Sequence, residues 1–496
     1  MASYTKVAVK GTVTILIMSV IAAFLGYLVR WALARNLTVE EFGLFYAVFA
    51  FLALLTIFKT FGFDRSLAKF IPEFRHSGGN EFIKSSIVYV SVLLLVTNAI
   101  IIILVYLLAD YLSIHFFHNP GAGIVLKLMA IAFFADTFVN VIKFSFQGFQ
   151  RMTLFSGVDV VRMVIILIII LAGFKLGYGI FSPVAAYIIV PLVLLLSFGH
   201  VFLKSVFPKF IESKFVMDSN LLKKISKYSM FIMLTGSGVI ILGYTDSIML
   251  TYFSGLAAVG LYNVALPTAK ILLALPNAFG SVLLPLTSEL WVKKNYTLLK
   301  AGVESLYKYS MIVTIPMAIV MFSFAELLIE VLFGKNFVLA GAAMKILAVG
   351  MIFATIHAIH SNFFQGIGKP EVQSKIIYIS ALFNLAGNLI MIPLFGIAGA
   401  AISTSLSYLI MMLIGLIQIR KFIKIEFPIK IWIKILAAGL MFIFVISLLK
   451  RILLLNVWLE AFLVLAVSGM VYAALLFILK VIGIGEIKNL YERIAK

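Results

Sequence analysis

Cysteine is absent from this chain of 496 residues, and charged residues are scarce. Without cysteine there is no disulfide, no thiolate metal ligand and no cysteine nucleophile. Charged residues make up 12% of the chain and apolar residues 63%, whereas a soluble domain carries about 25% charged residues. These shortages exclude a soluble globule and indicate a polytopic membrane protein.

Acidic residues are the scarcer of the two charged types. The chain has 20 acidic and 40 basic residues, a formal net charge of +20. Such an excess is compatible with nucleic-acid binding, but the basic residues gather in alternate short connections, which is the pattern of membrane topology. These connections include residues 65–84, 204–227, 293–300 and 420–424. We therefore expect no nucleic-acid partner, and we expect a multi-pass protein of the cell (plasma) membrane with both termini in the cytoplasm.

Long apolar segments make up most of the chain. Each has about 20 residues or more, the length of a spanning helix, and none shows the two-residue alternation of outer-membrane barrel strands. The first lacks a small-residue cleavage site and is too long for a signal-peptide core, so we expect it to be retained. The sequence predicts an all-α fold with fourteen transmembrane helices near residues 11–34, 42–62, 82–109, 122–146, 153–175, 179–203, 226–253, 257–284, 300–325, 338–365, 372–394, 396–417, 431–449 and 456–480.

The marks of enzymes and ATP-driven pumps are also missing. Residues 366–370 have a lysine but neither the spacing nor the Ser/Thr of a phosphate-binding loop. The longest predicted outer connection, residues 110–121, is too short to form a folded domain, and no paired carboxylates stand at an outer site as glycoside hydrolysis requires. We expect no catalytic residue, no metal and no cofactor; a membrane-embedded glycan-processing enzyme is the weaker alternative.

The chain contains an internal repeat. Phe42-Gly43-Leu44-Phe45 recurs as Val259-Gly260-Leu261-Tyr262, Phe61-Gly62 as Phe279-Gly280, and Gln147-Gly148 as Gln365-Gly366. The offset between the two copies is the same for all three segments to within a single position. A constant offset indicates duplication, because shared apolar composition has no register.

The repeat predicts the domain organisation. We expect six-helix lobes at 1–205 and 226–418, a cytoplasmic linker at 206–225, and two extra transmembrane helices with a cytoplasmic tail at 419–496. Because six is even, both repeats keep the same orientation, and two such bundles with a cavity between them are typical of transporters. The linker is either an amphipathic helix on the anionic inner leaflet or a solvated hinge, and the tail from residue 486 is a second amphipathic candidate.

Basic residues inside the predicted spans are the first functional candidates, because a charge at membrane depth needs a wet cavity or a partner. Lys270 lies near the middle of its span, and its repeat counterpart is Ala53, so we expect Lys270 to face a cavity. Arg30 either lines a cavity or reaches the membrane interface. Arg162 and Asp159 are three residues apart, a spacing that favours a self-neutralised pair on one helix face.

Other polar residues leave two interpretations open. Asp136 neutralises a cation or carries a proton, and the cations near the cytoplasmic helix ends, Lys59, Arg65 and Lys143, are topology signals or the mouth of a basic cavity. A group of oxygen-bearing side chains suits a sodium ion or plain interhelical hydrogen bonding; this group is Asp246, Asn384, Asn388 and Thr404. His357 and His360 are either titrating groups or satisfied polar residues of the bundle.

Four segments carry a family resemblance: residues 35–45 (RNLTVEEFGLF), 61–64 (FGFD), 245–250 (TDSIML) and 259–265 (VGLYNVA). Together with the repeat, they resemble the polysaccharide flippases of the multidrug/oligosaccharidyl-lipid/polysaccharide exporter superfamily, over essentially the whole chain. The resemblance implies two lobes in a V shape that alternate between inward-open and outward-open states. It also implies transport of a polyprenyl- or dolichyl-linked oligosaccharide to the outer leaflet.

The resemblance assigns roles to the candidates. Lys270 and Arg30, joined by Arg162, would hold the lipid phosphate, and the two extra helices would form a groove for the lipid tail. Similar sodium sites in related flippases support the oxygen group, although an Asn stands where a second carboxylate would strengthen it, so Na+ or H+ is the expected coupling ion. Glycan assembly enzymes and membrane lipids are the expected partners. A cation-coupled multidrug exporter of the same superfamily is the alternative.

Overall fold

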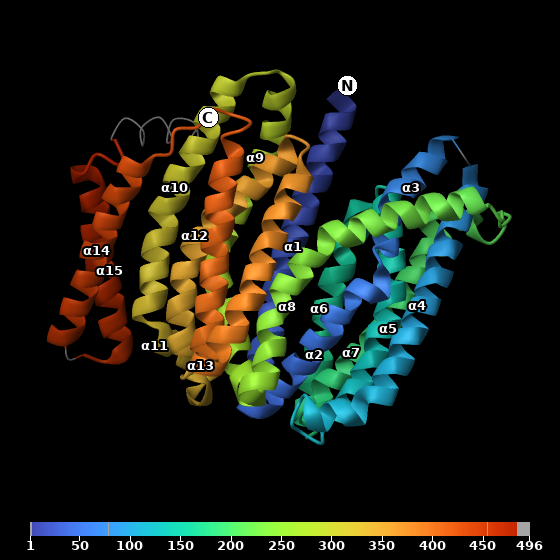
Figure 1. Ribbon diagram of the computed structural model, residues 1–496, viewed down its shortest axis with the longest axis horizontal. Coiled ribbons are helices and arrows are strands. Elements are labelled where there is room, and N and C mark those ends of the chain that lie inside the picture. The colour runs from blue at the N-terminus through green and yellow to red at the C-terminus, as the bar shows by residue number, and fades with distance from the viewer. Residues whose placement is uncertain (1, 78, 454, 484–496) are drawn as a thin grey trace. The chain divides into compact units, whose positions relative to one another are not determined.

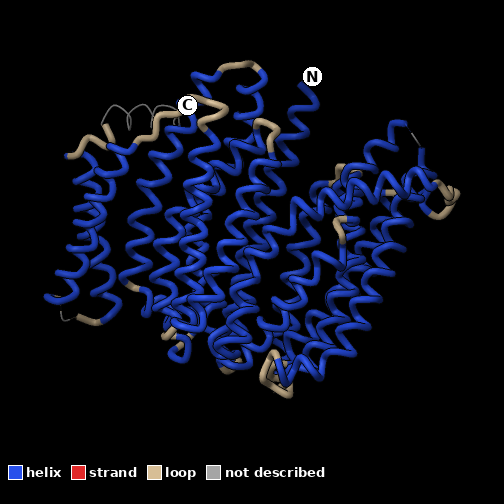
Figure 2. The backbone as a smooth tube through the Cα atoms, viewed as in Figure 1, coloured by secondary structure: helices blue, strands red, loops and turns tan. Residues whose placement is uncertain are grey.

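The computed structural model describes residues 2–77, 79–453 and 455–483 (Figure 1). Within these residues the chain is helical and forms no strand (Figure 2). Its α-helices are α1 (Ala2–Asn36), α2 (Val39–Thr60), α3 (Phe63–Ser77), α4 (Gly79–His115), α5 (Ala122–Gly148), α6 (Met152–Lys175), α7 (Phe181–Val201), α8 (Ser219–Ala269), α9 (Ala274–Val292), α10 (Tyr296–Ser323), α11 (Ala325–Phe333), α12 (Ala340–Gly366), α13 (Pro370–Ile419), α14 (Ile429–Ile452) and α15 (Val457–Ile478).

Short turns of other helix types join some of these elements. Residues 202–206 form a π-helix, and three 3₁₀ turns cover Pro208–Phe210, Lys270–Leu273 and Lys335–Phe337. Twelve helical segments of the described chain are long and apolar enough to cross a membrane. The protein is therefore an all-helical, multi-pass membrane protein, as predicted. Two of the twelve segments contain a glycine with non-helical backbone, Gly255 in α8 and Gly396 in α13.

The helices pack into two compact units, one ending at Asn263 and the other beginning at Val264. In the first unit, α5 packs against α2, α3, α4, α6 and α7, and α1 packs along α6. Helix α2 begins with a capping box, in which Thr38 and Glu41 accept each other's backbone N–H bonds. Helix α3 is amphipathic and buries Leu67, Phe70 and Ile71 against its neighbours.

Within the first unit, α2 crosses the last turns of α8 at very short range. A Cβ added to Gly43 would lie 1.8 Å from the carbonyl oxygen of Leu256, and one added to Gly260 would lie 2.4 Å from that of Val39. The contact is reciprocal, because Val39 and Gly43 are the repeat counterparts of Leu256 and Gly260. Only glycine fits at both positions, since any larger residue would overlap backbone.

The predicted linker is ordered on the first unit. Phe207 is buried and packs against Phe149 and Phe202, and Lys84 donates hydrogen bonds to the carbonyls of Ile211 and Ser213. Further on, Ser85 and Tyr89 of α4 accept the backbone N–H groups of residues 216 and 218. Side chains of α4 thus provide hydrogen bonds to the non-helical residues 211–218. Whether the segment lies on the inner leaflet or acts as a hinge stays a prediction. The predicted amphipathic tail from residue 486 lies outside the described residues.

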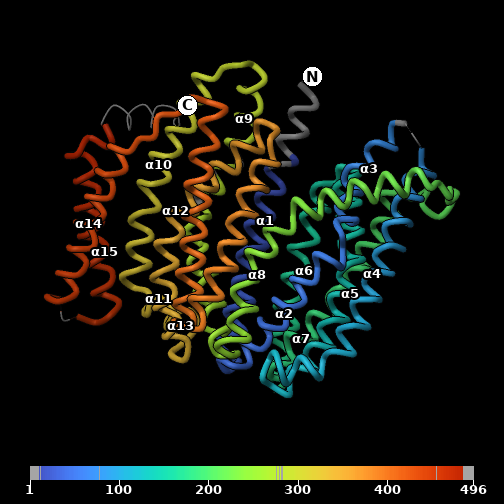
Figure 3. The backbone as a smooth tube through the Cα atoms, in the orientation of Figure 1, coloured from blue at the N-terminus to red at the C-terminus, as the bar shows by residue number. Residues whose placement is uncertain are grey.

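In the second unit, α12 is the central helix and packs against α9, α10, α11 and α13, and Figure 3 shows α14 and α15 side by side. The α14–α15 pair packs on α10 through α14. Pro316 has no N–H and leaves the carbonyl of Ile312 without its usual partner in α10. The Tyr472 hydroxyl of α15 donates to that carbonyl at 3.0 Å. A hydrogen bond thus joins α15 to the proline position of α10.

Candidate functional site

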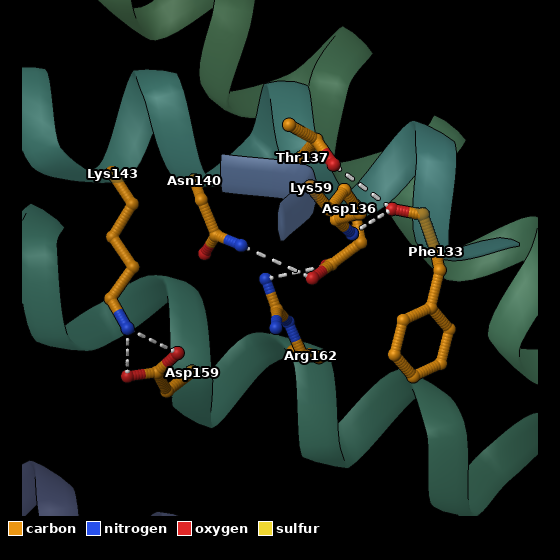
Figure 4. A network of polar contacts seen from close by, with 8 residues as sticks. All are labelled: Lys59, Phe133, Asp136, Thr137, Asn140, Lys143, Asp159 and Arg162. Carbon is orange, nitrogen blue, oxygen red and sulfur yellow. Dashed lines mark hydrogen bonds and ion pairs between the residues drawn. The ribbon is translucent and has the colours of Figure 1, made fainter. Parts of the chain in front are cut away.

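A network of charged side chains joins α5 to α6 in the first unit (Figure 4). The Arg162 guanidinium lies 2.9 Å from Oδ1 of Asp136, and Lys143 Nζ lies 2.6 and 2.8 Å from the two carboxylate oxygens of Asp159. Asn140 donates to Asp136 at 3.2 Å. The predicted pairing of Asp159 with Arg162 on one helix was wrong: each residue finds its partner on α5, where positions 136, 140 and 143 share one face.

Lys59 brings a third cation to this face of α5. Its ammonium is buried at the end of α2 and donates to the carbonyl of Phe133, one turn before Thr137. Thr97 donates to the carbonyl of Lys59 at 2.8 Å, and Asn98 joins Lys59 to Thr137 through hydrogen bonds at 3.3 and 3.0 Å. A buried lysine is costly unless hydrogen-bonded, and these contacts hold it in a fixed position.

Two cavities meet at this network. The larger, of about 250 Å³, is lined by three cations and two carboxylates together with polar and apolar side chains; the charged ones are Lys59, Arg65, Lys143, Asp64 and Asp136. The smaller, of about 170 Å³, is lined by Arg162 and Tyr187 among mainly apolar residues. Phe133 and Asp136 line both. Each cavity has room for several water molecules at about 30 Å³ each.

The charge of the larger cavity is net positive. Asp64 lies in α3, outside the predicted and observed spans, and burial raises the pKa of its carboxyl above the ordinary value of 3.8. Burial therefore disfavours the negative charge of Asp64, while Arg65 and Lys143 also line the cavity and Lys143 pairs with Asp159. Arginine and lysine in a partly dry cavity donate charge-assisted hydrogen bonds, which suit phosphate and carboxylate oxygens.

Arg30 of α1 also belongs to the first unit. Its guanidinium carbon lies 4.8 Å from the centre of the Tyr46 ring, a cation–π contact. Among the described residues, nothing accepts a hydrogen bond from its buried Nε. Aromatic contacts continue from Tyr46 through Phe45 to Tyr187 in the wall of the smaller cavity.

Lys270, the remaining predicted phosphate ligand, begins the 3₁₀ turn between α8 and α9 and is exposed. It belongs to the second unit, whereas Arg30 and Arg162 belong to the first. The structure gives each of these residues a local setting, and their joint action on one phosphate stays a prediction.

The predicted cation group is divided in the same way. In the second unit, Asn384 donates to Thr404 at 3.2 Å and accepts from Asn388 at 3.1 Å. Asp246 lies in the first unit and accepts a 2.5 Å hydrogen bond from the Tyr262 hydroxyl. Three of the four oxygen-bearing residues therefore lie together. Among the described residues, no cluster of three His, Cys, Asp or Glu side chains has the arrangement of a metal site.

The two histidines of α12 have hydrogen-bond partners within the second unit. His360 lies 2.7 Å from the Tyr307 hydroxyl, and His357 lies 2.9 Å from the Gln373 amide nitrogen. Within the described residues the Nδ1 atom of each ring is buried and has no hydrogen-bond partner, so the choice between titrating groups and satisfied polar residues stays open.

Sequence reasoning understated Lys59, Arg65 and Lys143, which were expected chiefly as topology signals and which line the larger cavity. A signal for Lys143 was present in the sequence. It follows Asp136 and Asn140 at helical spacing, so one face of a largely apolar span carries an acid, an amide and a base. Such a face is unusual for a helix against lipid and indicates a polar interior.

Comparison with known proteins places the chain in a family. Residues 8–291, more than half of the chain, match the family model for polysaccharide biosynthesis proteins. The chain belongs to the polysaccharide biosynthesis protein family. Residues 232–390 also match the MatE model. An uncharacterized membrane protein of Methanocaldococcus jannaschii is 35% identical over the full length of both chains. The probable low-salt glycan biosynthesis flippase Agl15 of Haloferax volcanii is 23% identical over 84% of each chain.

Solved structures show the same fold at low sequence identity. The lipid II flippase MurJ, in an inward closed conformation, superposes with a TM-score of 0.73 at 18% identity over 93% of this chain and 98% of that one. An inward-facing multidrug resistance MATE family transporter of the MOP superfamily gives 0.65 at 16% identity, over 80% and 93% of the chains. The polysaccharide biosynthesis protein described here therefore shares its fold with flippases and with drug exporters.

Proposed function

We propose that this protein is a flippase, and not an enzyme, for a polyprenyl- or dolichyl-(di)phosphate-linked oligosaccharide. It moves this lipid from the cytoplasmic to the outer leaflet by alternating access, for assembly of a surface polysaccharide or glycoprotein. The observation that carries the proposal is the cation-lined cavity of about 250 Å³ among helices of membrane-spanning length. Membership of the polysaccharide biosynthesis family and similarity to a probable glycan flippase support it.

The chemistry of the cavity suits this cargo. A lipid-linked sugar has an anionic phosphate, a polar glycan and an apolar tail, and only the first two need to leave the hydrocarbon. Lys59, Arg65, Lys143 and Arg162 offer N–H donors to the phosphate. We keep Arg30 and Lys270 in the phosphate-binding set as proposals. A cavity for cationic drugs needs the opposite charge, so the multidrug exporter is the second candidate, supported by the fold and by the MatE model match over residues 232–390.

We propose fourteen crossings arranged as two parallel repeats. Dividing α8 at Gly255 and α13 at Gly396 turns the twelve long segments into fourteen. Helix boundaries support the duplication, because both ends of α12 lie at the repeat offset from the ends of α5. Helix α13 likewise begins at the counterpart of the start of α6 and ends at the counterpart of the end of α7. An even number of crossings puts both termini on one side, the cytoplasm by the positive-inside rule.

The coupling ion that we propose is Na+ or H+. Asp246 offers a carboxylate, and Asn384, Asn388 and Thr404 offer oxygen atoms, which are the ligands that a hard cation prefers. Membrane potential acts on any net charge that moves, with about 2.3 kcal/mol per charge per 100 mV. Enzymes that build the glycan are the partners that we propose for supply and removal of the lipid.

The test is translocation of a fluorescent polyprenyl-diphosphate oligosaccharide in proteoliposomes, with and without a sodium or proton gradient. We expect wild-type protein to move the lipid and the variants Arg162→Gln and Lys270→Ala to move it far more slowly. Asp110→Asn is the control, because Asp110 pairs with Lys127 outside both cavities and is 80% exposed. Transport of cationic drugs, with no movement of any lipid-linked sugar by folded protein, would establish the exporter instead.

A further inference from the structure

Both carboxylates of the α5–α6 network are paired with cations that the proposed function needs for its substrate. Asp136 contacts Arg162, and Asp159 contacts Lys143. All four side chains are partly open, with exposed fractions of 29%, 18%, 36% and 15% in the order named. The Lys143–Asp159 pair is therefore accessible from the space around it. In the other pair Asp136 is the more open partner, and the Nε and Nη2 atoms of Arg162 are buried.

The cavities lie directly against these pairs. Asp136 lines both cavities, Lys143 lines the larger and Arg162 lines the smaller. Carboxylate and phosphate oxygens accept the same charge-assisted hydrogen bonds from arginine and lysine. An anion that enters either cavity thus meets cations that already lie within ion-pair distance of a carboxylate (Figure 4).

We propose that Asp136 and Asp159 are built-in competitors of the substrate, which its phosphate oxygens displace from Arg162 and Lys143. The proposal rests on the proposed function and adds a specificity rule to it. Separating an ion pair inside a protein leaves a charge without compensation. A ligand therefore binds only if it brings negative charge to the cation in place of the carboxylate. A diphosphate brings enough negative charge to replace both carboxylates, and a monophosphate brings less.

The competing carboxylates weaken the binding of every anion, and they weaken the binding of weakly charged anions most. Specificity is a difference of affinities, and a built-in competitor raises this difference at the expense of absolute affinity. The same carboxylates favour release, because they re-form their pairs when the phosphate leaves. A purely structural role, in which the pairs only hold α5 to α6, predicts the opposite result on neutralisation: a less stable protein with unchanged or weaker binding.

The experiment measures binding of farnesyl diphosphate, farnesyl monophosphate and inorganic diphosphate to the purified full-length protein. The variants are Asp136→Asn and Asp159→Asn, separately and together, with Asp110→Asn as the control that removes a surface partner of Lys127. We expect each cavity variant to bind farnesyl monophosphate about tenfold more tightly, since a charge-assisted contact is freed. The preference for diphosphate over monophosphate then falls, and the control keeps wild-type values.

The outcomes separate this inference from the flippase proposal. Wild-type binding of the lipid phosphates with no gain in either folded Asn variant overturns the inference and leaves the flippase standing. Failure of wild type and variants to bind either lipid phosphate overturns the flippase, and a gain for inorganic diphosphate in the variants then still supports the competitor role. Thermal unfolding identifies any variant that does not fold, and because the two pairs are tested separately, one folded variant is sufficient.

Discussion

The four charged positions of the α5–α6 pair in the first unit have uncharged counterparts in the second. At the offset that relates Gly148 to Gly366, the counterparts of Asp136, Lys143, Asp159 and Arg162 are Ala354, Ser361, Ile377 and Ser380. These counterparts lie on α12 and α13, which pack against each other as α5 and α6 do. The same helix boundaries and packing therefore form without a single one of the four charges.

This difference separates residues that are needed for the packing of the helix pair from residues that are available for binding a ligand. If the ion pairs were needed for packing, the duplicated pair would need them too. The buried polar residues of the second unit are neutral at the corresponding depth, among them Asn384, Asn388 and His360. Placing charges in a membrane protein is costly, so charges confined to one copy indicate a ligand contact and not a scaffold.

The strongest test gives the first unit the residues of the second, in the variant Asp136→Ala, Lys143→Ser, Asp159→Ile, Arg162→Ser. We expect it to fold with a change in unfolding free energy of about 1–2 kcal/mol, because exposed or paired charges contribute little net stability. Two cations are lost, each making contacts of about 1.5–3 kcal/mol to an anion. Removal of the two competing carboxylates offsets part of this loss, so binding of farnesyl diphosphate should fall about tenfold or more.

Thermal unfolding and lipid binding together check this variant. A protein that no longer folds would show that the charges are structural in the first unit despite the neutral copy in the second. Replacing Ser380, the counterpart of Arg162, by Ala is the matched change in the second unit, and it should leave diphosphate binding within a factor of two or so.

The second prediction concerns a feature that the repeats share. Gly43→Ala puts a methyl group on the carbonyl of Leu256, and Gly260→Ala puts one on that of Val39. Overpacking of this kind costs about 1–3 kcal/mol, and the two substitutions should cost similar amounts because the contact is reciprocal. Thermal midpoints in detergent measure the effect. Gly157→Ala and Gly302→Ala are controls, since nothing lies within 4 Å of an added Cβ there; equal losses in all four variants would show a general helix effect.

Sequence alone predicted an all-helical, multi-pass membrane protein because spanning helices depend on local apolar patterns; the count of fourteen and the repeat arrangement stay predictions. The helix ends at Gly148 and Gly366 follow directly from the duplicated Gln-Gly. Partners across helices could not be predicted in this way. The i,i+3 spacing of Asp159 and Arg162 favoured a local pair, and only the packing of α5 on α6 shows that Lys143 and Asp136 compete for them.

The sequence predicted the kind of site, a cation-rich interior, but not the full set of residues that form it. A cation-rich interior follows from charges in apolar segments. Arg162, whose phosphate role came only from the family resemblance, lines the smaller cavity, and that role stays a prediction. Lys59 was assigned to topology because it stands near a helix end. Its hydrogen bond to the carbonyl of Phe133 depends on contact between α2 and α5, which no local pattern encodes.

The third prediction concerns a position where the second repeat, and not the first, carries the unusual residue. Pro316 interrupts the hydrogen bonds of α10, and its counterpart in the first repeat is Asn98. Tyr472→Phe removes the donor to the Ile312 carbonyl and should cost about 1–2 kcal/mol of unfolding free energy, because a buried acceptor is left unsatisfied. In a Pro316→Ala background the helix supplies its own N–H, so the same change should cost less. Thermal unfolding of the four proteins of this cycle measures the coupling, and equal costs in both backgrounds would separate Tyr472 from the proline.

The smallest effect is expected from Asp64, whose repeat counterpart is Val282. Burial raises the pKa of Asp64 in the folded protein above its ordinary value of 3.8, so the folded state binds its proton more tightly than the unfolded state does. The stabilisation from this proton is fully present below pH 3.8 and is lost as pH rises through the folded pKa. Asp64→Asn removes the titrating group and should flatten the dependence of the thermal midpoint on pH just above 3.8. An unchanged slope would mean that other carboxyls control the pH dependence of the thermal midpoint.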